Sequence, residues 1–307
     1  MNANQLPNFN PSAATRLNRD IDPNEHFTPI PVQRKKKGRL GCLILILPIL
    51  GVIGLYFFAP LRTNIVLLGI DERSQDGSAL GRSDTNIIIS IVPLRPTVNM
   101  LSIPRDLWVT IPGVGENRIN TAHFYAEIEQ PDSGPQATLE TVRLNFGLTI
   151  PYFARVRFDS FQYIVEAMGG VTVDLDRPMG GYAAGQHNLN SQQALAFARD
   201  RAGADDFFRM EQGQFLLKAA FAQMLNPASY PRIPAVTTAI LQSLDTNVPV
   251  WLWPRLGLAL LRAGPGGIDN RTLNRDMITP WQTPGGARVL LPNWEQINPL
   301  LTELFGQ

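Results

Sequence analysis

The chain has 307 residues, of which 44% are hydrophobic, so it is long enough for one sizeable core or for a domain with an anchor. Residues 1–59 carry seven Lys/Arg and three Asp/Glu, whereas the remainder carries 20 Lys/Arg and 23 Asp/Glu. This net-acidic remainder argues against general nucleic-acid binding, which needs a basic surface. The single cysteine, Cys42, excludes an intrachain disulfide and a cysteine-based metal site.

The N-terminal segment has the pattern of a tail followed by a membrane anchor. Residues 1–33 are rich in Asn and Pro and predict a disordered tail. The basic cluster Arg34–Arg39 precedes an uncharged run, Leu40–Ala59, of about 20 residues, which is enough to span a bilayer core. The positive-inside rule then predicts that 1–39 are cytoplasmic, 40–59 form a single-pass transmembrane helix, and 60–307 are extracytoplasmic. A cleaved signal peptide is the competing interpretation, but no clear small-x-small site follows the run.

The remainder alternates between strand and helix patterns. Short runs of branched apolar residues predict strands at 64–70, 85–92, 97–103, 108–111, 152–158 and 171–175. Helical spacing predicts helices at 137–146, 161–168, 191–197 with Ser191 as the cap, and 208–225. Beyond residue 230 we expect two or three helices and a short strand near Val289. The alternation predicts one α/β domain, an α-β-α sandwich around a central mixed sheet.

Charged residues gather where the first three buried strands begin or end. If these strands are neighbours, their loops bring six side chains to one edge of the sheet, where α/β proteins tend to bind ligands: Asp71, Arg73, Arg82, Asp84, Arg105 and Asp106. Two carboxylates among several arginines suit a hard cation that bridges phosphate oxygens, with arginine forks neutralising the remaining charge. The plain alternative is that these residues pair with one another as solvated strand ends.

A second charged cluster follows a predicted helix. It comprises Arg199-Asp200-Arg201 and Asp205-Asp206-Phe207-Phe208-Arg209. Cations near a helix C-terminus are favourable in themselves, so this cluster also has a purely structural interpretation. His123 and His187 are isolated and are expected to be loop or core residues rather than ligands.

These motifs, in this order and spacing, resemble the LytR–CpsA–Psr family of bacterial cell-wall proteins. The resemblance covers about residues 60–225 and rests on Asn64–Arg73, Gly81–Thr85, Ser102–Asp106, Arg118–His123, Phe161–Asp174, Leu189–Arg201 and Asp206–Arg209. It implies a phosphotransferase that moves a glycan or anionic polymer from an undecaprenyl-pyrophosphate carrier onto peptidoglycan. One departure is Glu211, which stands where the family often has a cation.

The resemblance also implies roles for individual residues. Asp71 and Asp84 would hold Mg²⁺ (or Mn²⁺). The pyrophosphate would be surrounded by Arg73, Arg82, Arg105, Arg199, Arg201 and Arg209. The polyprenyl tail would occupy an apolar tunnel, for which aromatic side chains are available at Phe153, Phe158, Phe161, Phe197 and Phe215. Each of these aromatic residues taken alone is better explained as core.

The expected reaction is attack by a sugar hydroxyl on the sugar-proximal phosphorus, with lipid phosphate leaving. Such chemistry depends mainly on alignment and charge neutralisation. Arg105 is therefore counted with the catalytic residues, and Asp106 and Asp206 are candidates to accept the hydroxyl proton. The expected partners are the polyprenyl-pyrophosphate-linked glycan, the peptidoglycan acceptor and membrane lipid, and no nucleic acid. Three alternatives stay open: a polyprenyl-pyrophosphate phosphatase, a non-enzymatic cell-envelope regulator (a transcriptional attenuator), and a lipid-binding module without turnover.

Overall fold

The computed structural model describes residues 39–59, 61–71, 81–94, 97–200 and 206–306, without the side chains of 39–45 and of Asp206. The chain divides into two units, residues 1–49 and 50–307. Helix α1 (Arg39–Phe58) covers the run for which the sequence predicts a membrane span. Within the described residues, no helix combines the length and the apolar character needed to cross a membrane. The single span therefore stays a prediction.

A six-stranded sheet forms the centre of the second unit, in the order β10-β3-β2-β1-β6-β9. The strands are β1 (Thr63–Asp71), β2 (Arg82–Val92), β3 (Thr97–Ile103), β6 (Tyr152–Arg157), β9 (Asp245–Thr246) and β10 (Ile268–Thr272). β2 runs antiparallel to β1 and β3, whereas β6 runs parallel to β1 and β10 parallel to β3. The predicted mixed sheet is thus confirmed, and its centre consists of the branched apolar runs identified in the sequence.

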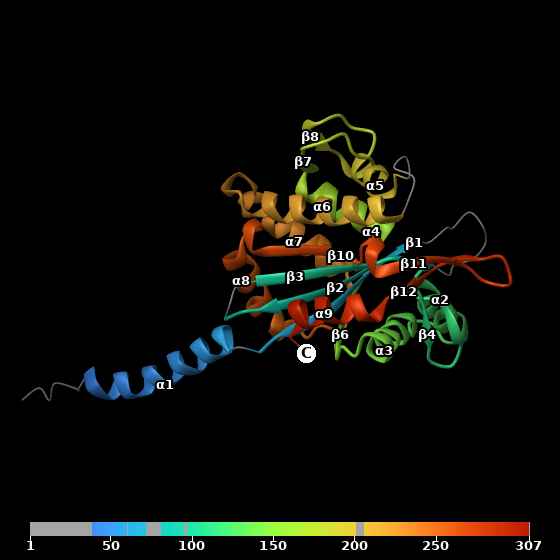
Figure 1. Cartoon of the computed structure of the whole chain (residues 1–307). Coiled ribbons are helices and arrows are strands. Elements are labelled where there is room, and N and C mark those ends of the chain that lie inside the picture. Colours follow the sequence, from blue (N-terminus) through green and yellow to red (C-terminus); the bar gives the residue numbers. More distant parts are fainter. Residues whose placement is uncertain (1–38, 60, 72–80, 95–96, 201–205, 307) are drawn as a thin grey trace, which may run out of the picture. The chain divides into compact units, whose positions relative to one another are not determined.

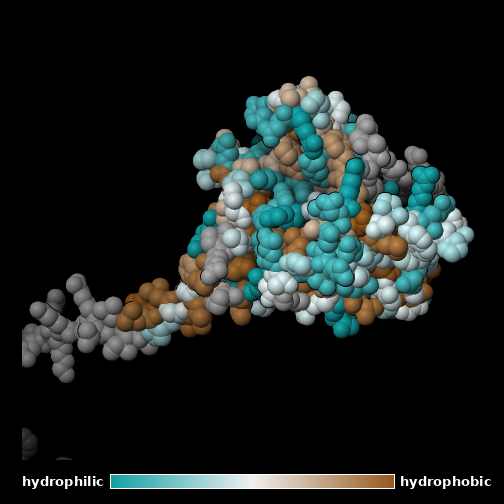
Figure 2. All heavy atoms as spheres, viewed as in Figure 1, coloured by the Kyte–Doolittle hydropathy of each residue, from teal (hydrophilic) through white to brown (hydrophobic). Residues whose placement is uncertain are grey.

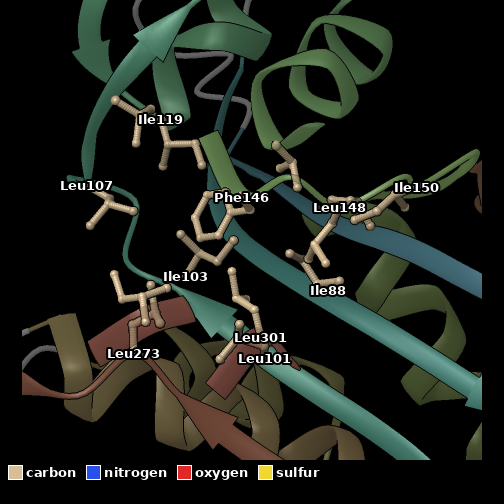
Figure 3. Packing of buried hydrophobic residues seen from close by; sticks show 14 of the residues in the cluster. Ile88, Leu101, Ile103, Leu107, Ile119, Phe146, Leu148, Ile150, Leu273 and Leu301 are labelled. Atoms are coloured by element: carbon tan, nitrogen blue, oxygen red, sulfur yellow. The ribbon is translucent and has the colours of Figure 1, made fainter. Parts of the chain in front are cut away.

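Helices cover the first face of the sheet and enclose the largest core cluster (Figure 3). Ile88 and Leu101 project from the sheet toward Phe146 and Leu301, and all four are buried. The helices on this face are α2 (Asn120–Glu129), α3 (Gly134–Phe146) and α9 (Trp294–Phe305). Burying these side chains on both partners gives the first layer of the fold.

The second face meets α8 (Trp253–Ala263) in a separate cluster that includes Ile87, Met100 and Leu256. A third cluster joins α4 (Phe158–Met168), α5 (Ser191–Arg199), α6 (Asp206–Leu225) and α7 (Ile233–Ser243) with the hairpin of β7 (Val171–Leu175) and β8 (Gly185–Leu189). Figure 1 shows α4, α6 and α7 on the side of the sheet opposite α3 and α9. Helices therefore lie on both faces, as the sandwich prediction requires.

Two further hairpins lie outside the central sheet. They are β4 (Trp108–Ile111) with β5 (Gly115–Arg118), and β11 (Ile278–Gln282) with β12 (Arg288–Pro292). The predicted strands at 108–111, 97–103 and 171–175 are confirmed, as is the short strand near Val289. Helix α2 and strand β10 were not anticipated, because neither carries a strong periodic apolar pattern.

The start of α5 corrects one detail of the sequence analysis. The predicted cap, Ser191, is the first helical residue, and the cap is Asn190. The Asn190 side chain accepts from the backbone N–H of Gln193, whose own side chain accepts from the Asn190 backbone N–H. This reciprocal capping box fixes the start of the helix that ends at Arg199.

A buried ionic cluster ties the first helical layer to the sheet. Arg155 of β6 is only 6% exposed and pairs with Glu127 of α2, with Asp132 at 2.7 Å and with Asp245 at 2.6 Å. Next to it His123, 2% exposed, donates from Nδ1–H to the carbonyl of Gly81 at 3.2 Å. His123 is thus a core residue, as the sequence analysis expected, and it holds the backbone just before β2.

Burial lowers the pKa of His123 below its ordinary value near 6.5, and the positive charge of Arg155 acts in the same direction against the opposing effect of Glu127. The unfolded chain therefore takes up this proton at higher pH than the folded chain. Stability that is complete above about pH 6.5 should fall as the pH drops below it.

In His123→Asn, the amide can still donate to Gly81 but cannot titrate. We expect the loss of melting temperature between pH 7.5 and 5.5 to be smaller in this variant than in the wild type. A His187→Asn control, altered at a half-buried position of β8, should keep the wild-type loss, and an unchanged loss in His123→Asn would contradict the assignment.

Candidate functional site

The register of the sheet brings the charged loops together at one edge. Asp71, the last residue of β1, lies opposite Arg82, the first residue of β2. Gly69 pairs with Thr85 and Ile70 with Ser83, so that Asp84 has no partner in the ladder and forms a β-bulge. A bulge re-aims the side chain of its extra residue. Asn86 pairs with Ile103, which places the loop after β3, with Arg105, beside the same bulge.

Two arginines converge on the Asp84 side chain. Arg105 donates from Nη1 to both carboxylate oxygens at 3.1 Å. Arg209, in the second turn of α6, places Nη1 at 3.7 Å from Oδ2 and Nη2 at 3.4 Å from the Asp84 carbonyl. The three side chains are 14%, 21% and 11% exposed for Asp84, Arg105 and Arg209, so their charges interact under limited solvent screening. We call these three residues the Asp84 cluster.

Asp71 makes a separate ion pair. Its carboxylate is 9% exposed and lies 3.6 Å from Nη2 of Arg199, at the end of α5. The Arg199 guanidinium also lies over the ring of Phe158, 4.6 Å from its centroid. The pair joins the end of β1 to the second helical layer, and the half-exposed Arg199 can also turn toward solvent or a ligand.

Asp106 has both carboxylate oxygens in ion pairs. Oδ1 lies 3.1 Å from Nε of Arg118, and Oδ2 lies 3.6 Å from Nε of Arg105. Arg118 and His123 are residues to which the sequence analysis gave no role at the site. The sequence signal that could have identified them is the motif Arg118–His123, of which they are the first and last residues. Both act on the site's frame: Arg118 holds Asp106, and His123 holds Gly81.

The other predicted residues are distributed as follows. Arg82 is exposed, and its guanidinium lies over the ring of Phe124, 5.2 Å from its centroid. Arg73 and Arg201 lie outside the described residues. Asp206 is the first residue of α6, but its side chain also lies outside the described part. The structure thus assembles Asp84, Arg105, Arg209 and Asp106 in one network and pairs Asp71 with Arg199.

The donor set at this edge is compatible with Mg²⁺. Among the described side chains, no three of the types His, Cys, Asp or Glu gather as an all-protein metal cage would require. Mg²⁺ commonly uses only one or two carboxylates and completes its shell with water and substrate phosphates. Asp71 and Asp84, on neighbouring strands, match that smaller set, so a shared ion stays a prediction.

The aromatic residues considered for a tunnel lie in different parts of the core. Phe197 is completely buried in the third cluster, against which Phe161 and Phe215 also pack. Phe153 packs against the first cluster, and the ring of Phe158 lies under the guanidinium of Arg199. The plain interpretation therefore holds for Phe197 in particular.

The departure at Glu211 is compensated from another part of the chain. Nη2 of Arg177, in the connection between β7 and β8, lies 2.6 Å from both carboxylate oxygens of Glu211. The cation of Arg177 therefore lies beside Glu211, although α6 itself has no cation at this position.

Replacing Asp84 by asparagine should leave Arg105 and Arg209 without their common anion. Loss of charged hydrogen bonds in a largely buried setting costs roughly 1.5–3 kcal/mol, so we expect a lower melting temperature without ligand. Added inorganic pyrophosphate should then raise the melting temperature of Asp84→Asn more than that of the wild type, because it replaces the missing anion. Asp174→Asn, altered at an exposed position of β7, is the matched control. A smaller pyrophosphate effect in Asp84→Asn than in the wild type would contradict this role.

The sequence is similar to those of known proteins. A sequence profile described as the LytR_cpsA_psr family matches residues 61–303. TagU of Oceanobacillus iheyensis, a polyisoprenyl-teichoic acid–peptidoglycan teichoic acid transferase, is 32% identical over 249 residues, which are 79% of this chain and 75% of that protein. Regulatory protein MsrR of Staphylococcus aureus is 26% identical over 196 residues, 61% of this chain and 57% of that protein.

The fold is also shared with solved structures. A structure of TagT bound to LIIa-WTA superposes with a TM-score of 0.63 at 22% identity, covering 80% of this chain and 91% of that one. The profile match extends beyond residue 225, where the motifs recognised in the sequence end. The chain belongs to the LytR–CpsA–Psr family.

Proposed function

We propose that this protein transfers a glycan or anionic polymer from an undecaprenyl-pyrophosphate carrier to peptidoglycan. The observation that carries the proposal is the Asp84 cluster, in which two arginines of separate elements share one carboxylate at the edge of the sheet. Arginine forks suit phosphate oxygens as well as carboxylates, so the same two side chains can exchange Asp84 for a pyrophosphate. The transferase names of relatives such as TagU support this chemistry.

The chain's own residues would contribute alignment and charge neutralisation. Arg105 and Arg209 lie within reach of one anion, and Arg199 stands at the neighbouring strand end. Arg82 is exposed at the same edge. Cations fixed before the reaction stabilise charge that grows on the leaving phosphate without needing to reorganise. Asp71 and Asp84 would hold the Mg²⁺ (or Mn²⁺), which would neutralise phosphate charge as a Lewis acid.

A carboxylate must accept the proton of the attacking hydroxyl in this scheme. Asp106 is less suited than the sequence alone indicated, since Arg118 and Arg105 occupy its two oxygens. Asp106 would then orient Arg105, and Asp206 at the start of α6 becomes the preferred proton acceptor of the two.

The lipid tail would lie against the second face of the sheet. There Leu67 and Ile89, on the two middle strands, are only partly buried, and so are Tyr152, Ala154 and Phe221 around them. Central strands in a two-sided sheet are ordinarily buried on both faces. Incompletely covered aliphatic and aromatic side chains at this depth suit a polyprenyl chain entering beneath the helices.

The extracytoplasmic location belongs to the same proposal. It rests on the basic cluster Arg34–Arg39 and on the uncharged run after it. Large apolar side chains of α1 between Ile46 and Leu55 are exposed, as the brown spheres of that helix indicate in Figure 2.

A reporter fused after Gln307 should be active only outside the cytoplasm, and activity inside would contradict the topology.

Two other outcomes deserve a direct test. Water could replace the sugar hydroxyl, which would make the protein a phosphatase, and the regulator name of MsrR favours a role without turnover. The test supplies a polyprenyl-pyrophosphate-linked oligosaccharide with and without peptidoglycan. Glycan that becomes covalently attached to peptidoglycan supports transfer, whereas free glycan phosphate alone supports hydrolysis. An unchanged donor under both conditions supports the regulator.

Arg105→Lys is expected to slow release of polyprenyl phosphate by one to two orders of magnitude. Lysine cannot reproduce a two-pronged contact with phosphate, and losing one charge-assisted hydrogen bond costs roughly 1.5–3 kcal/mol. Because lysine keeps the charge beside Asp84, the melting temperature should change little. Arg143→Lys, altered on the exposed side of α3, controls for the substitution itself. Equal rates in Arg105→Lys and wild type would show that Arg105 serves only as an ion-pair partner.

A further inference from the structure

A polar groove runs between α6 and β10, which lie side by side in Figure 1. It has a volume of about 580 Å³, and four of its residues recur on one side of α6 at helical spacing: Phe207, Glu211, Gln214 and Lys218. The opposite wall includes Asn270 and Thr272, alternate residues of β10. Figure 2 shows mainly hydrophilic residues where these two elements meet.

The groove continues into a second one along the same helix. This neighbour, of about 550 Å³, shares Phe215 and Lys218 with the first and extends to Asn226 just beyond the helix. From Phe207 to Asn226 the helical rise gives a length of roughly 28 Å. We call the two together the α6 trough. Its first end lies at the opening turn of α6, two residues from Arg209 of the Asp84 cluster.

The walls of the trough are held by buried or half-buried amides. Gln214 is 5% exposed and donates to Ser102 Oγ and to the Arg271 carbonyl, both at 2.7 Å. Gln223 accepts from the Thr172 backbone N–H at 2.8 Å and donates to the Gly170 carbonyl at 2.9 Å. The trough is therefore formed before any ligand arrives, which reduces the entropy lost on binding.

The lining suits a carbohydrate. Amide and hydroxyl groups can both donate and accept, as sugar hydroxyls do, and Phe207 and Phe215 offer flat apolar surface. The Oδ1 atom of Asn270 is buried and has no hydrogen-bond partner among the described residues. A hydroxyl donor that reaches this acceptor would stabilise it.

The charges favour a nearly neutral glycan over a polyanion. Lys218 is the only lysine after residue 37, and it lies in the middle of the trough. Glu211 is held by Arg177, Arg275 lies over the ring of Phe207, and Asp174 adds an exposed carboxylate to the second groove. A chain with a phosphate on every repeat would need a row of cations. One lysine fits a polysaccharide with widely spaced carboxylates.

We propose that the α6 trough binds the glycan strand of the peptidoglycan acceptor, with Lys218 on the carboxylate of a muramic acid that carries no peptide. That this glycan is the acceptor of the reaction rests on the proposed function. The binding of a glycan in the trough does not depend on that function. Bound there, the strand would extend to the start of α6, the turn that also carries Arg209, with one hydroxyl presented there.

Binding can be tested on the full chain without any donor. The probes are peptide-free glycan strands from peptidoglycan, neutral oligomers of N-acetylglucosamine, and poly(glycerol phosphate). Wild type should bind both glycans and bind the carboxylate-bearing strands more tightly. Lys218→Gln should weaken binding of those strands by about tenfold or more, because a charge-assisted hydrogen bond is lost, and should leave the neutral oligomers unaffected. Asn270→Leu should weaken both.

The matched control is Gln192→Leu, the same kind of amide-to-leucine change in a separate polar groove of about 650 Å³ beside α5. It should bind all three probes as the wild type does, and thermal melts verify that each variant is folded. Wild-type affinity in both Lys218→Gln and Asn270→Leu would overturn the proposal, as would trough-dependent binding of poly(glycerol phosphate) alone. Release of polyprenyl phosphate is measured in a separate assay. If the protein binds glycan but releases no polyprenyl phosphate, only the proposed function is contradicted. If it releases polyprenyl phosphate but binds no glycan, only the proposed role of the trough is contradicted.

Discussion

One carboxylate held between two arginines organises the charged edge of this protein. Asp84 can occupy that position only because the β1–β2 ladder skips it, which turns its side chain out of the register. Arg105 arrives from the loop after β3 and Arg209 from α6, so a single anion joins two strands and a helix of the second layer. Removing either partner would leave charge in a setting with little solvent.

The rest of the fold keeps that edge in place. The middle strands place Val66, Leu68 and Ile88 on the first face, where they pack beneath α3 and α9. The ion pairs of Arg155 anchor α2 to β6 and β9, and from α2 His123 holds Gly81, the residue just before β2. Charged residues can then remain at the edge, since the scaffold supplies the stability.

Part of this site could be read from the sequence. Apolar runs followed by Asp and Arg predict strands with charged ends, and the hairpin before Thr97 predicts that Asp84 and Arg105 are close. The sequence could not predict which arginine pairs with which aspartate. Arg199 pairs with Asp71, and Arg209 with Asp84, because of how α5 and α6 pack. β10 was missed because Asp269, Asn270 and Arg271 give it no apolar run, and its place in the sheet comes from pairing with β3.

The pairing of Asp84 with Arg105 and Arg209 explains how such a site could remain folded before its substrate arrives. Asp84 serves as an internal anion for arginines that otherwise repel each other, and a pyrophosphate with its metal would take over that role. The most direct measurement is a crystal structure with a short polyprenyl pyrophosphate and Mg²⁺. We expect phosphate oxygens in contact with Arg105 and Arg209, and Asp84 released to the ion. A pyrophosphate bound elsewhere, with the Arg105–Asp84 pair intact, would contradict it.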